Sequence, residues 1–235
     1  MEKQMYFKQI MIKILLLSSL VHSVNCQDLG SNILSFPENS EFAKPMDGKL
    51  PYFSKSEITP IWEIPKEGVR VIQSFRFLDQ NANEVTEKRM KGEISVVSFF
   101  FTRCAGICPT ITNNLKIIQS KKQNNVRLYS FSATPDLDSP SVLKKYAKER
   151  GINHLYWSLL TGEKEKIYDI ARNTFRADTI SAAQNRKKVV TKNDFLHSEN
   201  IYLLDKELRL RGIYNGRILS SINDLLADIE VLKKE

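Results

Sequence analysis

Hydrophobic and polar positions follow a regular pattern only from about residue 70 onward. Upstream, residues 27–60 hold four prolines and no sustained period, which predicts a linker and an N-terminal extension. Ile94–Phe101 is a near-continuous run of β-branched and aromatic residues, typical of a central strand buried on both faces. Apolar runs bounded by turn residues predict further strands at 71–78, 84–86, 126–132, 156–160, 201–204 and 208–214. Apolar residues at helical spacing predict helices at 109–122, 140–150, 163–175 and 218–234.

The order of these elements defines the fold class. Strands alternate with helices before a closing hairpin and helix, so we expect an α/β fold with a mixed central sheet flanked by helices and an N-terminal hairpin extension. A strand that leads into two cysteines at a helix start, followed by βαβ and ββα units, is typical of a thioredoxin-like fold. Residues 61–235 suffice for one such domain, with a polar, basic loop expected at 176–193.

Composition and charge exclude several classes of protein. Hydrophobic residues make up 42% and charged residues 26%, as in ordinary soluble domains, and nine glycines and eight prolines exclude collagen-like chains. The net charge is +8, but the densest basic clusters, Lys121–Lys122 and Arg186–Lys188, are not interleaved with aromatic residues. We therefore expect no nucleic-acid partner.

The first 25 residues have the layout of a secretory signal peptide. Lys3, Lys8 and Lys13 form a positive region, and a short apolar run at 14–21 and small residues follow. This run is far shorter than the ~20 apolar residues of a membrane-spanning helix, and a retained anchor with ragged ends is the alternative. Removal of residues 1–25 takes away three lysines and one glutamate and lowers the net charge to +6.

Cys26 ends this segment in a sequence, residues 23–27, that resembles a bacterial lipoprotein cleavage box. In such a box the cysteine is lipidated and becomes the first mature residue, although a residue smaller than Asn25 is usual before it. We expect export to the periplasmic side of the bacterial cell envelope and a lipid anchor at Cys26, with residues 26–60 as a lipid-proximal linker. The alternative is a plain exported or signal-anchored protein.

Cys104 and Cys108 directly follow the predicted buried strand. A cysteine at a helix N-terminus feels the positive end of the helix macrodipole, which favours the thiolate. In a turn at that position the two sulfurs can converge within range of a disulfide or of a shared metal ion. Three interpretations stay open: a structural disulfide closing a small loop, a redox pair suited to an exported protein, and a metal site, since two thiolates select Cu(I) or zinc.

A metal site would need a third ligand, and the chain has three histidines. His22 lies in the signal, and His154 follows a predicted helix, where a surface or packing role is expected. His197 precedes the strand at 201–204, and in a thioredoxin-like fold the loop before that strand faces the cysteines. Although a lone histidine is usually structural, this location favours a ligand. Two thiolates and one imidazole suit Cu(I), and a fourth ligand would extend the site to Cu(II).

Four segments together resemble the Sco/SenC family, the exported copper-binding proteins of cytochrome c oxidase assembly. Residues 99–109 resemble the family's strand followed by Cys-x-x-x-Cys-Pro, and residues 130–140 its Ser-x-Asp-Pro-x-x-Asp-Thr-Pro segment. Residues 157–162 resemble its Trp-x-x-Leu-Thr-Gly segment, and His197–Asp205 its histidine and following strand. The resemblance covers about residues 58–235 and supports the thioredoxin-like fold.

Carried onto this sequence, the resemblance implies that Cys104, Cys108 and His197 are copper ligands. It implies a copper metallochaperone for the binuclear CuA centre, with the copper-receiving subunit of cytochrome c oxidase, or another thiol or copper protein, as partner. The alternative is a thiol–disulfide oxidoreductase that reduces cysteines of a partner protein, with Cys104 as the attacking thiol. A copper or redox sensor and an antioxidant protein are further classes, which the cysteine pair with a facing histidine disfavours.

Two positions depart from the family pattern. Leu196 stands where an aspartate usually precedes the histidine, and Thr134 replaces the first aspartate of the Asp-Pro segment, whereas Asp138 is kept. A carboxylate beside a metal-bound histidine orients the ring and raises its basicity. Its absence is expected to weaken Cu(II) binding or to shift the balance toward thiol chemistry.

Overall fold

The structure is a computed structural model of the chain, and it describes residues 48–56, 58–64, 66–177 and 198–235. Its strands are β1 (Tyr52–Phe53), β2 (Pro60–Ile61), β3 (Arg76–Leu78), β4 (Glu84–Thr86), β5 (Ile94–Phe100), β6 (Val126–Ser132), β7 (Trp157–Leu160), β8 (Asn200–Leu204) and β9 (Leu210–Asn215). Its helices are α2 (Glu87–Met90), α3 (Cys108–Ser120), α4 (Pro140–Arg150), α5 (Lys164–Asp169), the π-helix η2 (Ile170–Thr174) and α6 (Leu219–Lys234). Within these residues no helix is long and apolar enough to cross a membrane.

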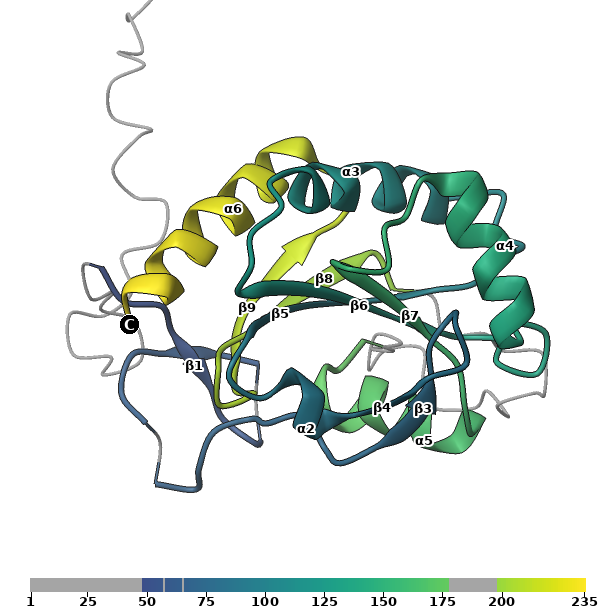
Figure 1. Cartoon of the computed structure of the whole chain (residues 1–235). Coiled ribbons are helices and arrows are strands. Elements are labelled where there is room, and N and C mark those ends of the chain that lie inside the picture. Colours follow the sequence, from purple (N-terminus) through teal and green to yellow (C-terminus); the bar gives the residue numbers. More distant parts are fainter. Residues whose placement is uncertain (1–47, 57, 65, 178–197) are drawn as a thin grey trace, which may run out of the picture. The chain divides into compact units, whose positions relative to one another are not determined.

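The central sheet has five strands in the order β7-β6-β5-β8-β9 (Figure 1). β5, β6 and β7 run parallel, whereas β8 is antiparallel to β5 and β9 to β8. β5 and β6 therefore end at the same edge of the sheet at which β8 begins; we call this edge the cysteine end, because Cys104 and Cys108 follow β5. The turn between β8 and β9 lies at the opposite end. The predicted mixed α/β fold is confirmed.

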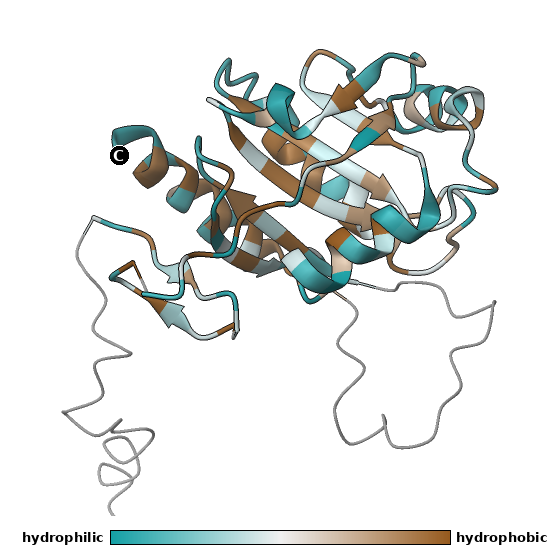
Figure 2. Ribbon diagram, turned by 90° about the horizontal axis from the view of Figure 1, so that it is seen from below, coloured by the Kyte–Doolittle hydropathy of each residue, from teal (hydrophilic) through white to brown (hydrophobic). Residues whose placement is uncertain are grey.

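Two hydrophobic cores lie on the two faces of this sheet. All seven residues of β5 are buried, with Val96 and Phe100 in one core and Val97 and Phe99 in the other, as expected for a central strand. Helices α3, α4 and α6 cover the first face, while the β3–β4 hairpin, α5 and η2 cover the second (Figure 1). The strands are largely hydrophobic and the helices carry both hydrophobic and hydrophilic residues (Figure 2). The cysteine pair thus follows the most buried strand of a two-sided core.

Three elements differ from the sequence-based expectation. The predicted strand at 71–78 is regular only in β3, and the four-residue helix α2 is shorter than any periodic signal. The predicted helix at 163–175 divides into α5 and η2, where the Phe175 N–H donates to the carbonyl of Ile170, five residues back. This wider turn accompanies the packing of Phe175 against Tyr202 of β8, with ring centroids 4.7 Å apart. For η2, the wider turn thus goes with a tertiary contact that no local pattern encodes.

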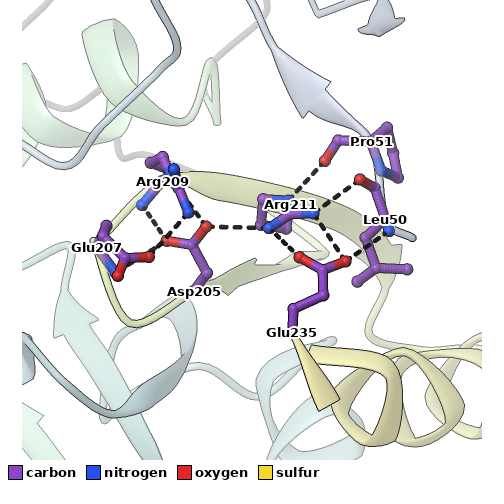
Figure 3. A network of polar contacts seen from close by, with 7 residues as sticks. All are labelled: Leu50, Pro51, Asp205, Glu207, Arg209, Arg211 and Glu235. Carbon is purple, nitrogen blue, oxygen red and sulfur yellow. Dashed lines mark hydrogen bonds and ion pairs between the residues drawn. The ribbon is translucent and has the colours of Figure 1, made fainter. Parts of the chain in front are cut away.

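The N-terminal extension is bound to the opposite end of the sheet by a buried arginine (Figure 3). Arg211 of β9 is 2% exposed and donates to the carbonyl oxygens of Leu50 and Pro51 at 2.8 and 3.0 Å. Its guanidinium lies 4.1 Å from the centroid of the Tyr52 ring and pairs with Glu235 at 2.8 Å. Residues 50–52 are therefore an integral part of the folded domain.

Candidate thiol and metal site

A tight turn and the first turn of α3 position the two cysteines. The N–H of Cys104 donates to the carbonyl of Phe101 at 3.2 Å, so Thr102 and Arg103 occupy the centre of a turn that directly follows β5. Cys108 is the first residue of α3, and Pro109 fits the first helical turn because no intrahelical partner is needed there. Cys108 is 5% exposed within the core beside α3, whereas Cys104 is partly exposed. Both cysteines are free thiols.

The two thiols differ in acidity because their surroundings differ. Partial burial opposes ionisation of Cys104, but hydrogen bonds from the Cys108 thiol and from the backbone at Gly106, Ile107 and Cys108 outweigh it and lower its pKa. Burial, and then the hydrogen bond to Cys104, raise the pKa of Cys108 to about 12. The interaction between the two thiols therefore favours ionisation of Cys104 over that of Cys108. Cys104 is thus the more accessible and more acidic thiol of the pair, and Cys108 is the buried one.

A buried carboxylate supports the turn before Cys104. Asp138 is 0% exposed and accepts hydrogen bonds from the Thr102 hydroxyl at 2.5 Å and the Thr102 N–H at 3.3 Å. The hydroxyls of Ser132, at the end of β6, and Thr134 donate to the same carboxylate at 2.6 and 3.0 Å. Thr134, which departs from the Sco/SenC pattern, therefore has a defined role as a donor to Asp138. Adjacent parallel strands end at one edge, and this signal would have pointed to Thr102 and Ser132, which the sequence reasoning missed.

The structure places only part of the predicted ligand set. Cys104 and Cys108 are brought together, while His197, Leu196 and Cys26 lie outside the described residues. His154 is exposed in the loop before β7, at the end of the sheet opposite the cysteines. Within the described ranges, no group of three or more histidine, cysteine, aspartate or glutamate side chains is arranged to hold a metal ion. In the described residues, the pair therefore offers two sulfur donors, one of which is partly exposed, and a metal ion bound there would need further ligands.

The interior behind Cys108 leaves little space for a ligand. The cavity there has a volume of about 10 Å³ and is lined by Cys108, Thr112 and Tyr146, by Ser98 and Ser130, and by apolar core residues. That volume corresponds to about one water molecule. Chemistry at the pair is therefore directed toward the accessible side, at Cys104.

The fold and the site define a thioredoxin-like protein with an accessible cysteine and a buried cysteine at the N-terminus of a helix. A sequence profile of the SCO1/SenC family matches residues 64–233, and the chain belongs to this family. The SCO1 protein homolog of Bacillus subtilis (strain 168) is 30% identical over 163 residues, which are 68% of this chain and 81% of the relative.

Solved structures share the same fold. A SCO1/SenC family lipoprotein from Bacillus anthracis matches with 26% identity and a TM-score of 0.59, over 69% of this chain and 95% of that one. BsSco, a member of the Sco family of cytochrome c oxidase assembly proteins for which a disulfide switch has been identified, matches with 27% identity and a TM-score of 0.58, over 70% and 94%. Yeast Sco1 with copper bound, at 23% identity and a TM-score of 0.52 over 68% and 88%, shares the fold. These matches confirm the family resemblance and the thioredoxin-like fold.

Proposed function

We propose that this protein is an exported copper metallochaperone that binds Cu(I) through Cys104, Cys108 and His197 and supports assembly of the CuA centre of cytochrome c oxidase. The observation that carries the proposal is the pair of free thiols, one partly exposed and one buried, in the short loop that leads into α3. Two soft sulfur donors from one short loop fit Cu(I), which prefers thiolates and low coordination numbers. Membership of the SCO1/SenC family supports copper as the metal and cytochrome c oxidase as the complex whose assembly is supported.

The topology supports His197 as the third ligand. It stands three residues before Asn200, where β8 begins, and β8 begins at the cysteine end of the sheet. A chain extends at most about 3.3–3.6 Å per residue, so His197 is confined to roughly 11 Å of Asn200. The partial exposure of Cys104 leaves the copper-binding side of the pair open to a ligand from that segment and to a partner protein.

Anaerobic competition with a Cu(I) chelator tests this function. The reduced protein is expected to bind one Cu(I) per monomer, Cys104→Ala/Cys108→Ala to lose this binding, and His197→Ala to weaken it at least tenfold. His154→Ala is the matched control, since that histidine lies at the opposite end of the sheet, and it retains the full affinity. Unchanged stoichiometry and affinity in the double cysteine variant would refute the proposal. Transfer of copper from the loaded protein to a metal-free CuA domain, followed by the absorbance of the CuA centre, then tests whether that domain is the recipient.

The difference between the two thiols also favours a second function, reduction of a disulfide in a partner protein. The Cys104 thiolate would attack one sulfur of the partner disulfide and release the other as a thiolate. Cys108 would then lose its proton and attack the Cys104 sulfur, which frees the second partner thiol and leaves the pair oxidised by two electrons. A Cys108→Ala variant that captures no mixed disulfide in cells would contradict this function.

We further propose that the mature protein is tethered to the membrane surface through a lipid on Cys26. The cleavage-box sequence at residues 23–27 supports this, as does the lipoprotein among the similar structures. The proposed division is a signal peptide at 1–25, a lipid-proximal linker and extension at 26–60, of which residues 50–52 pack onto the folded domain, and the domain at 61–235. Metabolic labelling with a fatty acid is expected to mark the wild-type protein and not Cys26→Ala. Absence of label in the wild type would overturn the anchor.

A further inference from the structure

The loop that carries Cys104 and Cys108 is supported differently at its two ends. Cys108 is fixed by α3, whose residues Ile111 and Leu115 are buried in the same core. Cys104 lies four residues earlier, after a turn, and Ala105 and Gly106 between them are exposed. In the described part of the chain, Thr102 is the one residue of 102–106 with hydrogen bonds to a side chain beyond this loop. The position of Cys104 relative to Cys108 therefore depends on what holds Thr102.

Asp138 holds Thr102 through both of its donors. The Thr102 hydroxyl reaches one carboxylate oxygen at 2.5 Å, and the Thr102 N–H reaches the other at 3.3 Å. Two donors to two oxygens fix both the backbone and the side chain at the first central position of the turn. No ion pair of Asp138 is found among the residues that the structure describes, so directional hydrogen bonds define its geometry.

Asp138 is itself held from the neighbouring strand. Ser132 is the last residue of β6, directly beside Phe100 of β5 in the sheet, and its hydroxyl donates to Asp138 at 2.6 Å. The N–H of Asp138 donates to the carbonyl of Thr134 at 3.0 Å, which closes the turn around the carboxylate. Asp138 thus connects Thr102, in the turn before Cys104, to the end of strand β6.

We propose that Asp138 is a positioning residue for the cysteine pair: it fixes, through Thr102, where Cys104 stands relative to Cys108. This inference rests on the proposed function insofar as the pair is the working site. Two groups held in register react or bind a common ion far better than two that must first be ordered. Both Cu(I) binding and disulfide formation between Cys104 and Cys108 then depend on Asp138, although Asp138 contacts neither sulfur.

The test compares Thr102→Val, Thr102→Ser and Asp138→Asn with a matched control, Asp205→Asn. Asp205 is also a buried aspartate, 4% exposed, and it lies at the opposite end of the sheet. The readouts are Cu(I) affinity by chelator competition and the thiol–disulfide equilibrium of the pair in glutathione buffers. We expect Thr102→Val and Asp138→Asn to lower both the Cu(I) affinity and the equilibrium constant for disulfide formation by about tenfold. For the disulfide, a two-electron couple, a tenfold change is roughly 30 mV. Thr102→Ser keeps the hydroxyl and is expected to retain the wild-type Cu(I) affinity and disulfide equilibrium. Asp205→Asn is expected to leave both unchanged.

Each result decides between the claims. Folded Thr102→Val and Asp138→Asn proteins with wild-type values in both readouts overturn the positioning role. An equal loss in Asp205→Asn also overturns it, because the effect would then reflect general destabilisation. A wild-type protein that binds no Cu(I) but forms the disulfide contradicts the copper function, and the disulfide equilibrium alone then decides the role of Asp138. A wild type that does neither overturns both.

Discussion

Asp138 and Asp205 are buried aspartates at the two opposite ends of the central sheet, and their partners differ in kind. At the cysteine end, Asp138 accepts hydrogen bonds from three uncharged hydroxyls and a backbone N–H. At the opposite end, Asp205 pairs with Arg209 at 2.7 Å and Arg211 at 3.1 Å, and Arg211 reaches on to Glu235 (Figure 3). Asp205 also accepts the N–H groups of Glu207 and Arg209 in the β8–β9 turn. Both carboxylates therefore order a turn, but within the described residues only Asp205 of the two is paired with cationic side chains.

This difference suggests a division of roles, in which one end of the sheet mainly stabilises the fold and the other supports the cysteine pair. The arginine network ties the N-terminal extension, the β8–β9 turn and the C-terminal residue together, far from the thiols. The hydroxyl network adjoins the turn that presents Cys104. We therefore expect substitutions at the opposite end to act on unfolding, and substitutions at the cysteine end to act on the thiols as well.

The largest expected effect is on stability, from Arg211→Ala. The change leaves Asp205 with one cationic partner fewer and removes the donors to the carbonyls of Leu50 and Pro51. Breaking a buried ion pair by removing one partner costs about 3–5 kcal/mol, and urea unfolding measures it. The thiol reactivity of the folded variant stays at the wild-type value. A loss of less than about 1 kcal/mol would contradict the claim that the arginine network is a main source of stability.

A smaller loss of stability is expected from Asp138→Asn. The amide keeps the shape of the carboxylate but accepts fewer hydrogen bonds, so one or two of its buried donors lose their acceptor. Such a loss costs about 1–3 kcal/mol, again measured by urea unfolding. If Asp138→Asn destabilised the protein more than Arg211→Ala, the assignment of structural and chemical ends would be reversed.

The thiols themselves provide the third prediction. Because the pKa of Cys104 is lowered, its thiolate forms at lower pH than that of an ordinary cysteine, and its alkylation rate levels off at correspondingly lower pH. Cys108, with a pKa raised to about 12 and a buried sulfur, stays protonated and protected. Iodoacetamide at pH 7 is expected to modify Cys104 at least about tenfold faster, by peptide mass spectrometry. Equal rates would contradict the described asymmetry.

The smallest effect is expected from Arg76→Ala. The Arg76–Glu84 ion pair has a distance of 3.0 Å, but its side chains are 77% and 51% exposed. Exposed ion pairs contribute little, so the free energy of unfolding changes by less than about 0.5 kcal/mol in the same urea assay. This variant is the baseline for Arg211→Ala, and a change of several kcal/mol would show that exposure does not govern these ion pairs.

The sequence predicted those parts of this molecule that rest on local pattern. Ile94–Phe100 is a central strand because its apolar run has no polar face, and Cys108 begins α3 next to a proline suited to that position. The π-helix at Ile170–Thr174 was not predictable, since its wide turn accompanies packing against a distant strand. The role of Thr102 depends on a carboxylate 36 residues away, and the only sequence signal for this contact is that the parallel strands before the two residues end at the same edge of the sheet. His197 and the lipid anchor stay predictions, because both lie outside the described residues.

The most direct test of the central claim is X-ray absorption spectroscopy of the Cu(I)-loaded protein, because it counts the ligands around the metal. The ligand set proposed for this chain predicts two sulfur scatterers and one imidazole nitrogen per copper ion. His197→Ala should lose the imidazole signal and keep both sulfurs, while His154→Ala retains the complete set. An unchanged imidazole signal in His197→Ala, or fewer than two sulfurs in the wild type, would contradict the proposed site.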